Sequence, residues 1–512
     1  MNLRLISGTL AALILVSPAG AMHDHAEAGH VKDDESVGVV TFQPDCEEAS
    51  ARAFDRALAF KHHMMYEQAR GLFRDLAETD PACAMGHWGV AATWFQPLWP
   101  GRPDQETLEA GRQAIERARE ADPGDARELA LIDPVAAFFE DDAGLGYRDR
   151  MAAWADGMAA AYAAHPDDLD VASLYGLSRL ALAMAADTET RNRLHDEAET
   201  VLRNVWQQEN AHPGAVHYAI HATDADGRAE NALAMVESYA DIAPNVPHAL
   251  HMPSHIYVRL GAWDEVIHWN RRSADVAIEH DVNGAVSFHY IHAMDYLVYG
   301  YLQQGDVEEA LAAYREAIAV ERHQAGFASA FHLAAMPARL AVEQRDWAAA
   351  RDLMARSPDY LAWEQFHWPQ GMTWYARGLG AMHTGEQELA DEAEQRLATL
   401  RERARDEGED RFATYIEVDR LILAGWMQHA AGDAEQAVSL MQDAAELEAT
   451  VEKDPITPGA LYPPYEALGD LLLLLDRPEE ALEAYQSSDG IWPGRRNTLA
   501  GMEAAREETA SR

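Results

Sequence analysis

The chain has 512 residues and a formal net charge of −45 at pH 7, with 86 acidic side chains against 41 basic ones. Only three of the basic residues are lysines, namely Lys32, Lys61 and Lys453. A surface this acidic repels phosphate backbones and anionic headgroups, so the composition argues against nucleic-acid and anionic-membrane partners.

The first 21 residues have the pattern of a cleaved secretory signal peptide. Arg4 precedes an apolar run over residues 10–16, and Ala19-Gly20-Ala21 supplies the small residues of a cleavage site. No later stretch approaches the roughly 20 apolar residues that a membrane span requires. We therefore expect a periplasmic or secreted protein whose signal peptide is cleaved after Ala21.

Residues 22–45 are predicted to form a disordered tail rich in histidine and acidic residues, because their polar sequence has no apolar period. His23, His25 and His30 in this tail are candidate copper or zinc ligands. The alternative is a solvated tail without a metal.

The chain has two cysteines, Cys46 and Cys83. In an oxidising compartment they can form one disulfide that closes the first helical hairpin, and the sequence leaves open whether they do. Two cysteines are too few for a zinc site built from thiolates.

Residues 46–512 are predicted to form a single all-α solenoid of the tetratricopeptide (TPR) type, a right-handed superhelix of about ten or eleven helical hairpins without a sheet. A small residue opens each second helix at spacings of 34 to 47 residues: Ala232, Val266, Ala310, Ala350, Ala390, Ala437 and Ala481. Residues 97–150 are less regular, and we interpret them as an insertion packed against the superhelix.

Three histidine-rich motifs follow one another in the central repeats, residues 212–299. They are HPGAVHYAIHATD, PHALHMPSHIYVR and HYIHAMDYLVY, and ten of the 23 histidines lie between residues 212 and 295. Spacings of three and four residues place side chains along one face of a helix. The repeat register turns these faces toward the concave groove. The predicted metal ligands are His217, His221, Asp224, His248, His251, His255, His289, His292 and Asp295.

A lone histidine on a helix is usually structural, but the same pattern on three adjacent helices favours metal binding. We expect six of these rings, those of His217, His221, His251, His255, His289 and His292, to point into one shared cavity with the two carboxylates at its edge. Imidazole suits copper, zinc and iron, and we favour copper or zinc. The excess of histidines would suit a dinuclear centre, or one ion with acid–base histidines.

Pro253 lies inside the second motif and must kink or begin a helix there, because it cannot donate a backbone hydrogen bond. We therefore expect His248 and His251 in a loop above His255.

The motifs CAMGHWGVAATWFQPLW, HPGAVHYAIHATD, PHALHMPSHIYVRLGAW and HYIHAMDYLVYGYLQQG together resemble a widespread group of exported bacterial TPR-repeat proteins. The resemblance covers most of the mature chain and implies the fold, but no defined activity. For TPR proteins at large it implies binding of a peptide or protein in the concave groove. This chain departs from that pattern because histidines fill its predicted groove.

Three functions remain open on the sequence. The first is a metalloprotein that acts on a small molecule or peptide in the groove, as an oxidoreductase or hydrolase, with Tyr257, Arg259 and Tyr299 as candidate catalytic residues. The second is a scaffold for envelope proteins. The third is a metal chaperone or buffer.

Overall fold

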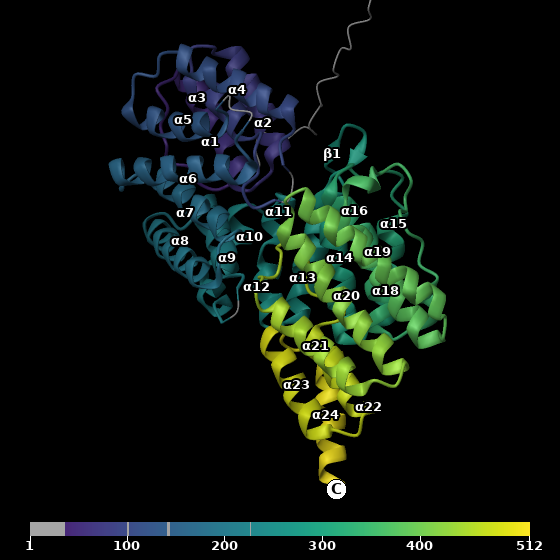
Figure 1. Cartoon of the computed structure of the whole chain (residues 1–512). Helices are drawn as coiled ribbons and strands as arrows, with labels where there is room; N and C mark the ends of the chain where they lie inside the picture. Colours follow the sequence, from purple (N-terminus) through teal and green to yellow (C-terminus); the bar gives the residue numbers. More distant parts are fainter. Residues whose placement is uncertain (1–35, 100–101, 141–143, 226) are drawn as a thin grey trace, which may run out of the picture.

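The computed structural model describes residues 36–99, 102–140, 144–225 and 227–512. The predicted signal peptide and the histidines of the predicted tail lie outside these residues. Figure 1 shows helices throughout, with the first helices (purple to blue) on one side and the last ones (green to yellow) on the other. The predicted all-α solenoid is confirmed.

The first half of the chain contributes these elements: α1 (Glu48–His62), α2 (Tyr66–Thr79), α3 (Ala84–Ala92), α4 (Gln105–Glu120), α5 (Ala126–Phe138), α6 (Tyr147–Ala164), α7 (Leu169–Ala183), α8 (Thr188–Gln208), α9 (Pro213–Thr223), η1 (Ala229–Ala232), α10 (Leu233–Ile242), α11 (Pro247–His251) and α12 (Pro253–Arg259).

The second half contributes α13 (Trp263–Ala277), β1 (Asp281–Val282), β2 (Ala285–Val286), α14 (Phe288–Gln304), α15 (Val307–Ile318), α16 (Phe327–Glu343), α17 (Trp347–Arg351), η2 (Trp363–Gln365), α18 (His367–Thr384), α19 (Gln387–Asp406), α20 (Asp410–Ala430), α21 (Ala434–Glu448), α22 (Pro464–Leu474), α23 (Pro478–Ile491) and α24 (Arg496–Ala510).

Consecutive helices pack in antiparallel pairs along the described chain, from α1 with α2 to α22 with α23, and α24 closes the array. The predicted small residues lie at the pair interfaces, since Ala232 is 1 % exposed and Val266 and the later five markers are fully buried. A larger side chain there would hold the two helices apart. The interpretation of residues 97–150 as an insertion is wrong, because α4 and α5 pair with α3 and α6 as members of the array.

Residues 36–45 are packed, so the predicted tail ends earlier than expected. The backbone amides of Thr41 and Phe42 donate to the Asp170 carboxylate at 2.9 and 2.8 Å, and the Val37 carbonyl lies 3.0 Å from Nε2 of His63. Phe42 is fully buried in the core. This one aromatic anchor and the buried carboxylate outweigh the polar composition of the segment.

Within the described part of the chain, the predicted absence of a sheet fails only at a short hairpin. Strands β1 and β2 pair antiparallel across Asn283 and Gly284, both of which have positive φ. An Asn-Gly pair favours this kind of two-residue turn, because both residues tolerate the left-handed region.

The superhelix is wound tightly enough for distant repeats to touch. Arg102 donates to the carbonyl of Gly408 at 2.8 Å, and Arg148 pairs with Asp410 at 2.8 Å. Farther along, the indole of Trp263 donates to the Gly494 carbonyl at 3.0 Å. The concave side is therefore closed by the chain itself, and the predicted open groove is not present around the histidine motifs.

The segment 449–463, between α21 and α22, completes this closure. It inserts the ammonium of Lys453 beside Asp224 at 3.0 Å, and its Pro455 carbonyl accepts a hydrogen bond from the Tyr296 hydroxyl at 3.0 Å. Thr457 and Gly459 accept from the guanidinium of Arg339 at 2.7 and 2.8 Å.

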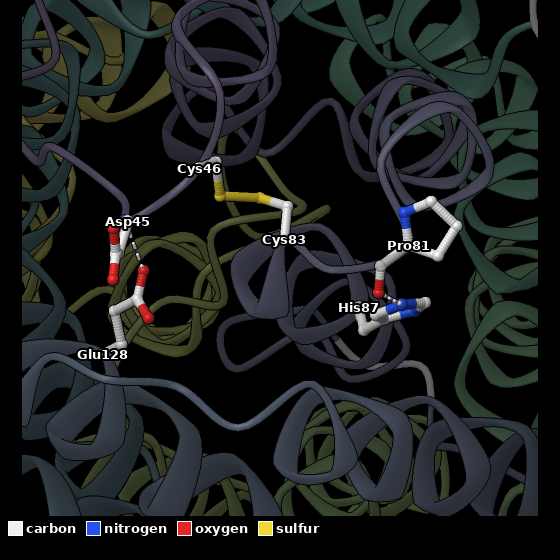
Figure 2. The surroundings of a disulfide bond; sticks show 6 residues. All are labelled: Asp45, Cys46, Pro81, Cys83, His87 and Glu128. Carbon is white, nitrogen blue, oxygen red and sulfur yellow. Dashed lines mark hydrogen bonds between the residues drawn. A yellow bond between two sulfur atoms is a disulfide. The ribbon is translucent and has the colours of Figure 1, made fainter.

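The two cysteines form a disulfide between the segment before α1 and the start of α3 (Figure 2). The bond closes the first hairpin at a sequence separation of 37 residues. Beside it, the backbone amide of Asp45 donates to the Glu128 carboxylate at 2.7 Å and links the same segment to α5.

None of the helices that the structure describes combines the length and the apolar character needed to cross a membrane.

Replacing Cys46 and Cys83 together by serine should lower the free energy of unfolding of the first repeats by about 3 to 4 kcal/mol, because the unfolded chain regains the entropy of an open loop. Urea unfolding followed by tryptophan fluorescence measures the loss. A reducing agent should shift the wild type in the same direction and leave the variant unchanged. Equal midpoints for wild type and variant would contradict the structural role of the bond.

Candidate metal centre

The histidine motifs occupy three neighbouring repeats around one buried point. His217 and His221 come from α9, His248 and His251 from α11, His255 from α12, and His289 and His292 from α14. All seven rings are 9 % exposed or less. Pro253 begins α12 as predicted, but His248 and His251 lie in the helix α11 instead of a loop, because Met252 between them and Pro253 keeps helical dihedrals.

The orientation of His255 is fixed by a carboxylate. Its Nδ1 lies 2.9 Å from Oδ2 of Asp224, whose other oxygen accepts from Nε of Arg259 at 2.8 Å. An ionised carboxylate only accepts, so Nδ1 of His255 carries the proton. Its Nε2 is then a lone pair.

The orientation of His251 is fixed by an amide. Nδ2 of Asn270 donates to the Val266 carbonyl at 2.7 Å, which directs Oδ1 of Asn270 toward Nδ1 of His251 at 2.7 Å. An amide oxygen accepts, so Nδ1 of His251 donates and its Nε2 is also a lone pair.

The orientation of His292 is fixed through a second histidine. Nδ1 of His332 lies 3.0 Å from Oδ2 of Asp295, and Nε2 of His332 lies 2.8 Å from Nδ1 of His292. Because the carboxylate takes the proton on Nδ1 of His332, the Nε2 of that ring accepts from His292. The free nitrogen of His292 is therefore Nε2.

These three orientations bring acceptor nitrogens together. Nε2 of His251 and Nε2 of His255 are 3.0 Å apart, and ligand nitrogens of these two rings and of His292 lie within 4.8 Å of one another. Two nitrogens at about 2.0 to 2.1 Å from one ion are about 2.8 to 3.4 Å apart for angles between about 90° and 109°. The pair therefore has the separation of two ligands on a common ion, whereas two lone pairs alone would repel.

Burial keeps these rings neutral, as metal ligation requires. It lowers the pKa of His251 and His292 well below the usual value, with the neighbouring histidines acting in the same direction. For His255 burial also lowers the pKa, and its hydrogen bond to Asp224 offsets part of this effect. Burial alone would raise the pKa of Asp224, but the charges of Lys453 and Arg259 hold it well below its usual range.

A second group of three rings adjoins the first. Ligand nitrogens of His217, His221 and His248 also lie within 4.8 Å of one another. The ring centroids of His221 and His255 are 5.6 Å apart, and those of His248 and His251 are 5.9 Å apart. The expected single cavity is thus two triads side by side, with His289 at one end, 5.1 Å from His248 between ring centroids.

A third cluster, His62, Asp170 and His212, has the composition of a metal site but serves the fold. Both Nε2 atoms share one oxygen of Asp170, at 3.0 and 3.1 Å. Nδ1 of His62 lies 3.1 Å from the Tyr218 hydroxyl, and Nδ1 of His212 accepts from the amide of Ala215. With every ring nitrogen engaged, the cluster ties α1, α7 and α9 together.

The remaining predicted site residues lie behind the rings or away from them. Asp224 contacts Nδ1 of His255, and Asp295 reaches His292 only through His332, so both carboxylates support histidine rings instead of converging with them. Arg259 is the ion-pair partner of Asp224. The Tyr299 hydroxyl accepts from Arg495 at 2.9 Å.

Of the three candidate catalytic residues, Arg259 neutralises a supporting carboxylate and Tyr299 lies beside Gly459 and Trp263. Tyr257 is only partly buried, with the carboxylates of Glu265 and Glu237 nearby. Among the described residues, neither tyrosine makes a ring contact with a triad histidine. The catalytic role of these three residues therefore stays a prediction.

Four residues at the centre were missed by sequence reasoning. Asn270 and Lys453 lie outside the motifs, and no local pattern marks them. Trp99 packs against His248 and His289, with ring centroids 5.4 and 6.1 Å away. Tyr296, whose ring centroid is 4.6 Å from that of His251, could have been found, because it lies one helical turn after His292.

Two clefts approach the triads from the surface. One, of about 190 Å³, is lined by His221, Asp224 and Lys453 among other residues. The other, of about 200 Å³, reaches His289 and Trp99. The two have no lining residue in common, so each provides its own approach to the centre.

Comparison with known proteins adds only a general likeness of fold. No family model and no curated protein matches the chain. Solved structures similar to it include yeast Tom70 (TM-score 0.32, 11 % identity, covering 91 % of this chain and 90 % of that one). A second is the APC/C hetero-tetramer Cut9-Hcn1 (TM-score 0.33, 11 % identity, covering 89 % of this chain and 90 % of that one). A third is the human IFIT1 dimer with m7Gppp-AAAA (TM-score 0.38, 11 % identity, covering 83 % of this chain and 90 % of that one). At these scores we draw nothing about function from them.

The buried neutral histidines predict that the metal-free protein loses stability in acid. Burial lowers the pKa of His62 to about 4 and that of His63 and His289 to about 3, from 6.5. Below pH 6.5 these histidines bind protons in the unfolded chain but stay neutral in the folded chain. The free energy of unfolding therefore falls as the pH falls from about 6.5 toward 4. Urea midpoints of the metal-free protein at pH 7, 6 and 5 should decrease in that order. A constant midpoint would contradict the burial of neutral rings.

Proposed function

We propose that this chain is an exported metalloprotein that holds a transition-metal ion, copper or zinc before iron, at His251, His255 and His292. The observation that carries the proposal is the 3.0 Å separation of two ring nitrogens that both present lone pairs. A shared proton does not relieve this contact, because burial lowers the pKa of both rings. The export part of the proposal rests on the signal-peptide pattern of residues 1–21.

The donor set favours copper or zinc. Three neutral imidazoles suit copper, zinc, iron and nickel, while magnesium and calcium prefer oxygen ligands. The thiolates that would favour a closed structural zinc site are absent from the ligand set, since the only cysteines are bonded to each other. Asp224 and Asp295 act from behind the ligands, an arrangement that fixes ring orientation and raises ligand basicity.

We further propose that the metal serves catalysis on a small molecule. Three protein ligands leave coordination positions open, as in catalytic zinc sites, whereas structural sites are filled by four. A bound ion of this kind supplies Lewis acidity, and copper also supplies redox chemistry. The chain holds the three rings neutral. The cleft of about 190 Å³ reaches His221, whose ring centroid is 5.6 Å from that of His255, so a small molecule could approach the centre from this side.

The alternative functions have less support at this site. Solenoids of helical hairpins commonly bind proteins on their concave face. Here the concave side around the motifs is covered by residues 449–463, and the histidines are 9 % exposed or less, so a folded partner cannot contact them. A buffer or chaperone must exchange its metal readily, and burial opposes that exchange.

Metal content tests the site directly. Protein purified without an affinity tag should contain copper or zinc, and replacing His251 and His255 together by glutamine should remove the ion bound at this triad. His323→Gln is the matched control. His323 is buried, as His251 and His255 are, but it lies outside the triads and is hydrogen-bonded to a backbone carbonyl. Unchanged copper, zinc and iron content in the double variant would refute the metal assignment.

The amide behind His251 provides a second test. Asn270→Leu removes the acceptor that orients His251, and loss of such a partner typically lowers metal affinity by roughly 10- to 100-fold. Competition with a chromophoric chelator measures the change. Asn270→Asp retains an acceptor oxygen at this position and should bind the metal more tightly than the leucine variant. Equal affinities for both variants and the wild type would show that the amide does not orient a ligand.

A further inference from the structure

The second triad, His217, His221 and His248, contains ring nitrogens without partners. Nε2 of His217, Nε2 of His221 and both nitrogens of His248 are buried and have no hydrogen-bond partner in the part of the chain that the structure describes. Buried polar atoms are nearly always paired, so several of them facing one point indicate a ligand. Their mutual distances, within 4.8 Å, suit a single ion.

The protonation state of His217 supports the same conclusion. Its Nδ1 lies 2.6 Å from the backbone carbonyl of His62, which can only accept. The proton is therefore on Nδ1, and the buried Nε2 is a lone pair. Nε2 of this ring is thus unprotonated and carries a lone pair, as Nε2 of His251 and Nε2 of His255 do in the first triad.

We propose that His217, His221 and His248 bind a second transition-metal ion, so that the chain carries two adjacent ions. This inference rests on the proposed function of the first triad and extends it to a dinuclear centre. Adjacent ions can act on one small molecule together, each ion binding a different atom of it. The cleft that His221 lines leads to the second ion.

The two sites differ in the number of hydrogen bonds that hold their histidine rings from behind. Each ring of the first triad has an outer hydrogen-bond partner on Nδ1, supplied by Asn270, Asp224 and His332. Among the described residues, the one such partner in the second triad is the carbonyl of His62, which accepts from His217. Outer partners contribute strongly to metal affinity. The second ion should therefore bind at least roughly tenfold more weakly than the first and leave first.

Zinc stoichiometry tests the proposal. The full chain, with His23, His25 and His30 replaced by alanine so that the tail contributes no ligands, is stripped with a chelator and titrated with Zn²⁺ alone. Bound zinc is counted after gel filtration, and calorimetry gives the affinity of each step. We expect two zinc ions per chain in two steps, the weaker of which disappears in the variant H217Q/H248Q while the tighter remains.

Retention of the tighter zinc-binding step in H217Q/H248Q also shows that this variant is folded. The control variant His323→Gln should retain both binding steps. If H217Q/H248Q does not fold, the single variant H221Q, at the cleft side, should lose the weaker step alone. Saturation of the parent chain at one zinc, removed by H251Q/H255Q, would overturn the second site and leave the first intact. Two zinc ions retained in H217Q/H248Q or in H221Q would also overturn it. Zinc binding unaffected by H251Q/H255Q would instead refute the proposed function.

Discussion

A hydrogen bond from the Nδ1 atom of a histidine to a buried acceptor is the interaction on which the centre depends. Asp224 accepts from His255 and pairs with Arg259, and Asp295 accepts from His332 and pairs with Arg339. In both cases the carboxylate belongs to one repeat, and the histidine and arginine belong to the next. The arginine neutralises the carboxylate, the carboxylate holds the proton on Nδ1, and the ring must then present Nε2 as a lone pair.

The solenoid supplies the conditions under which this interaction can act. Each first helix contributes one face to the inside of the superhelix, and close winding brings residues 449–463 over those faces. Lys453, the one basic residue of that segment, neutralises Asp224 from outside the motifs at 3.0 Å. Burial without this lysine and the two arginines would leave unpaired carboxylates in the interior, which is strongly unfavourable. The closing segment and the centre therefore depend on each other.

Much of the architecture could be read from the sequence because it is local. The small residues at the hairpin interfaces and the three- and four-residue spacing of the histidines follow from helix geometry. The turn at Asn283 and Gly284 also follows from a local rule, because both residues tolerate positive φ. Closure of the groove could not be predicted from the sequence, because it depends on the small rotation between neighbouring repeats added over many repeats.

The roles of the residues at the centre could be predicted only in part, because they too depend on contacts between repeats. Asp224 follows His221 by three residues and Asp295 follows His292 by three, so both resemble ligands of the same stripe. Each instead supports a histidine from the next repeat, and only the packing of neighbouring repeats decides between these roles. Asn270 and Lys453 carry no local signature, since Asn270 lies on the second helix of the hairpin, outside the histidine motifs, and Lys453 comes from a segment distant in the sequence.

We propose that outer hydrogen bonds turn the Nε2 atoms of His251, His255 and His292 toward one ion. The decisive measurement is anomalous diffraction at the zinc absorption edge from crystals of the zinc-loaded protein. We expect an anomalous peak about 2.0 to 2.1 Å from Nε2 of each of these three rings. A zinc-loaded crystal with no peak at that point, or with the ion bound through Nδ1 of any of these rings, would contradict it.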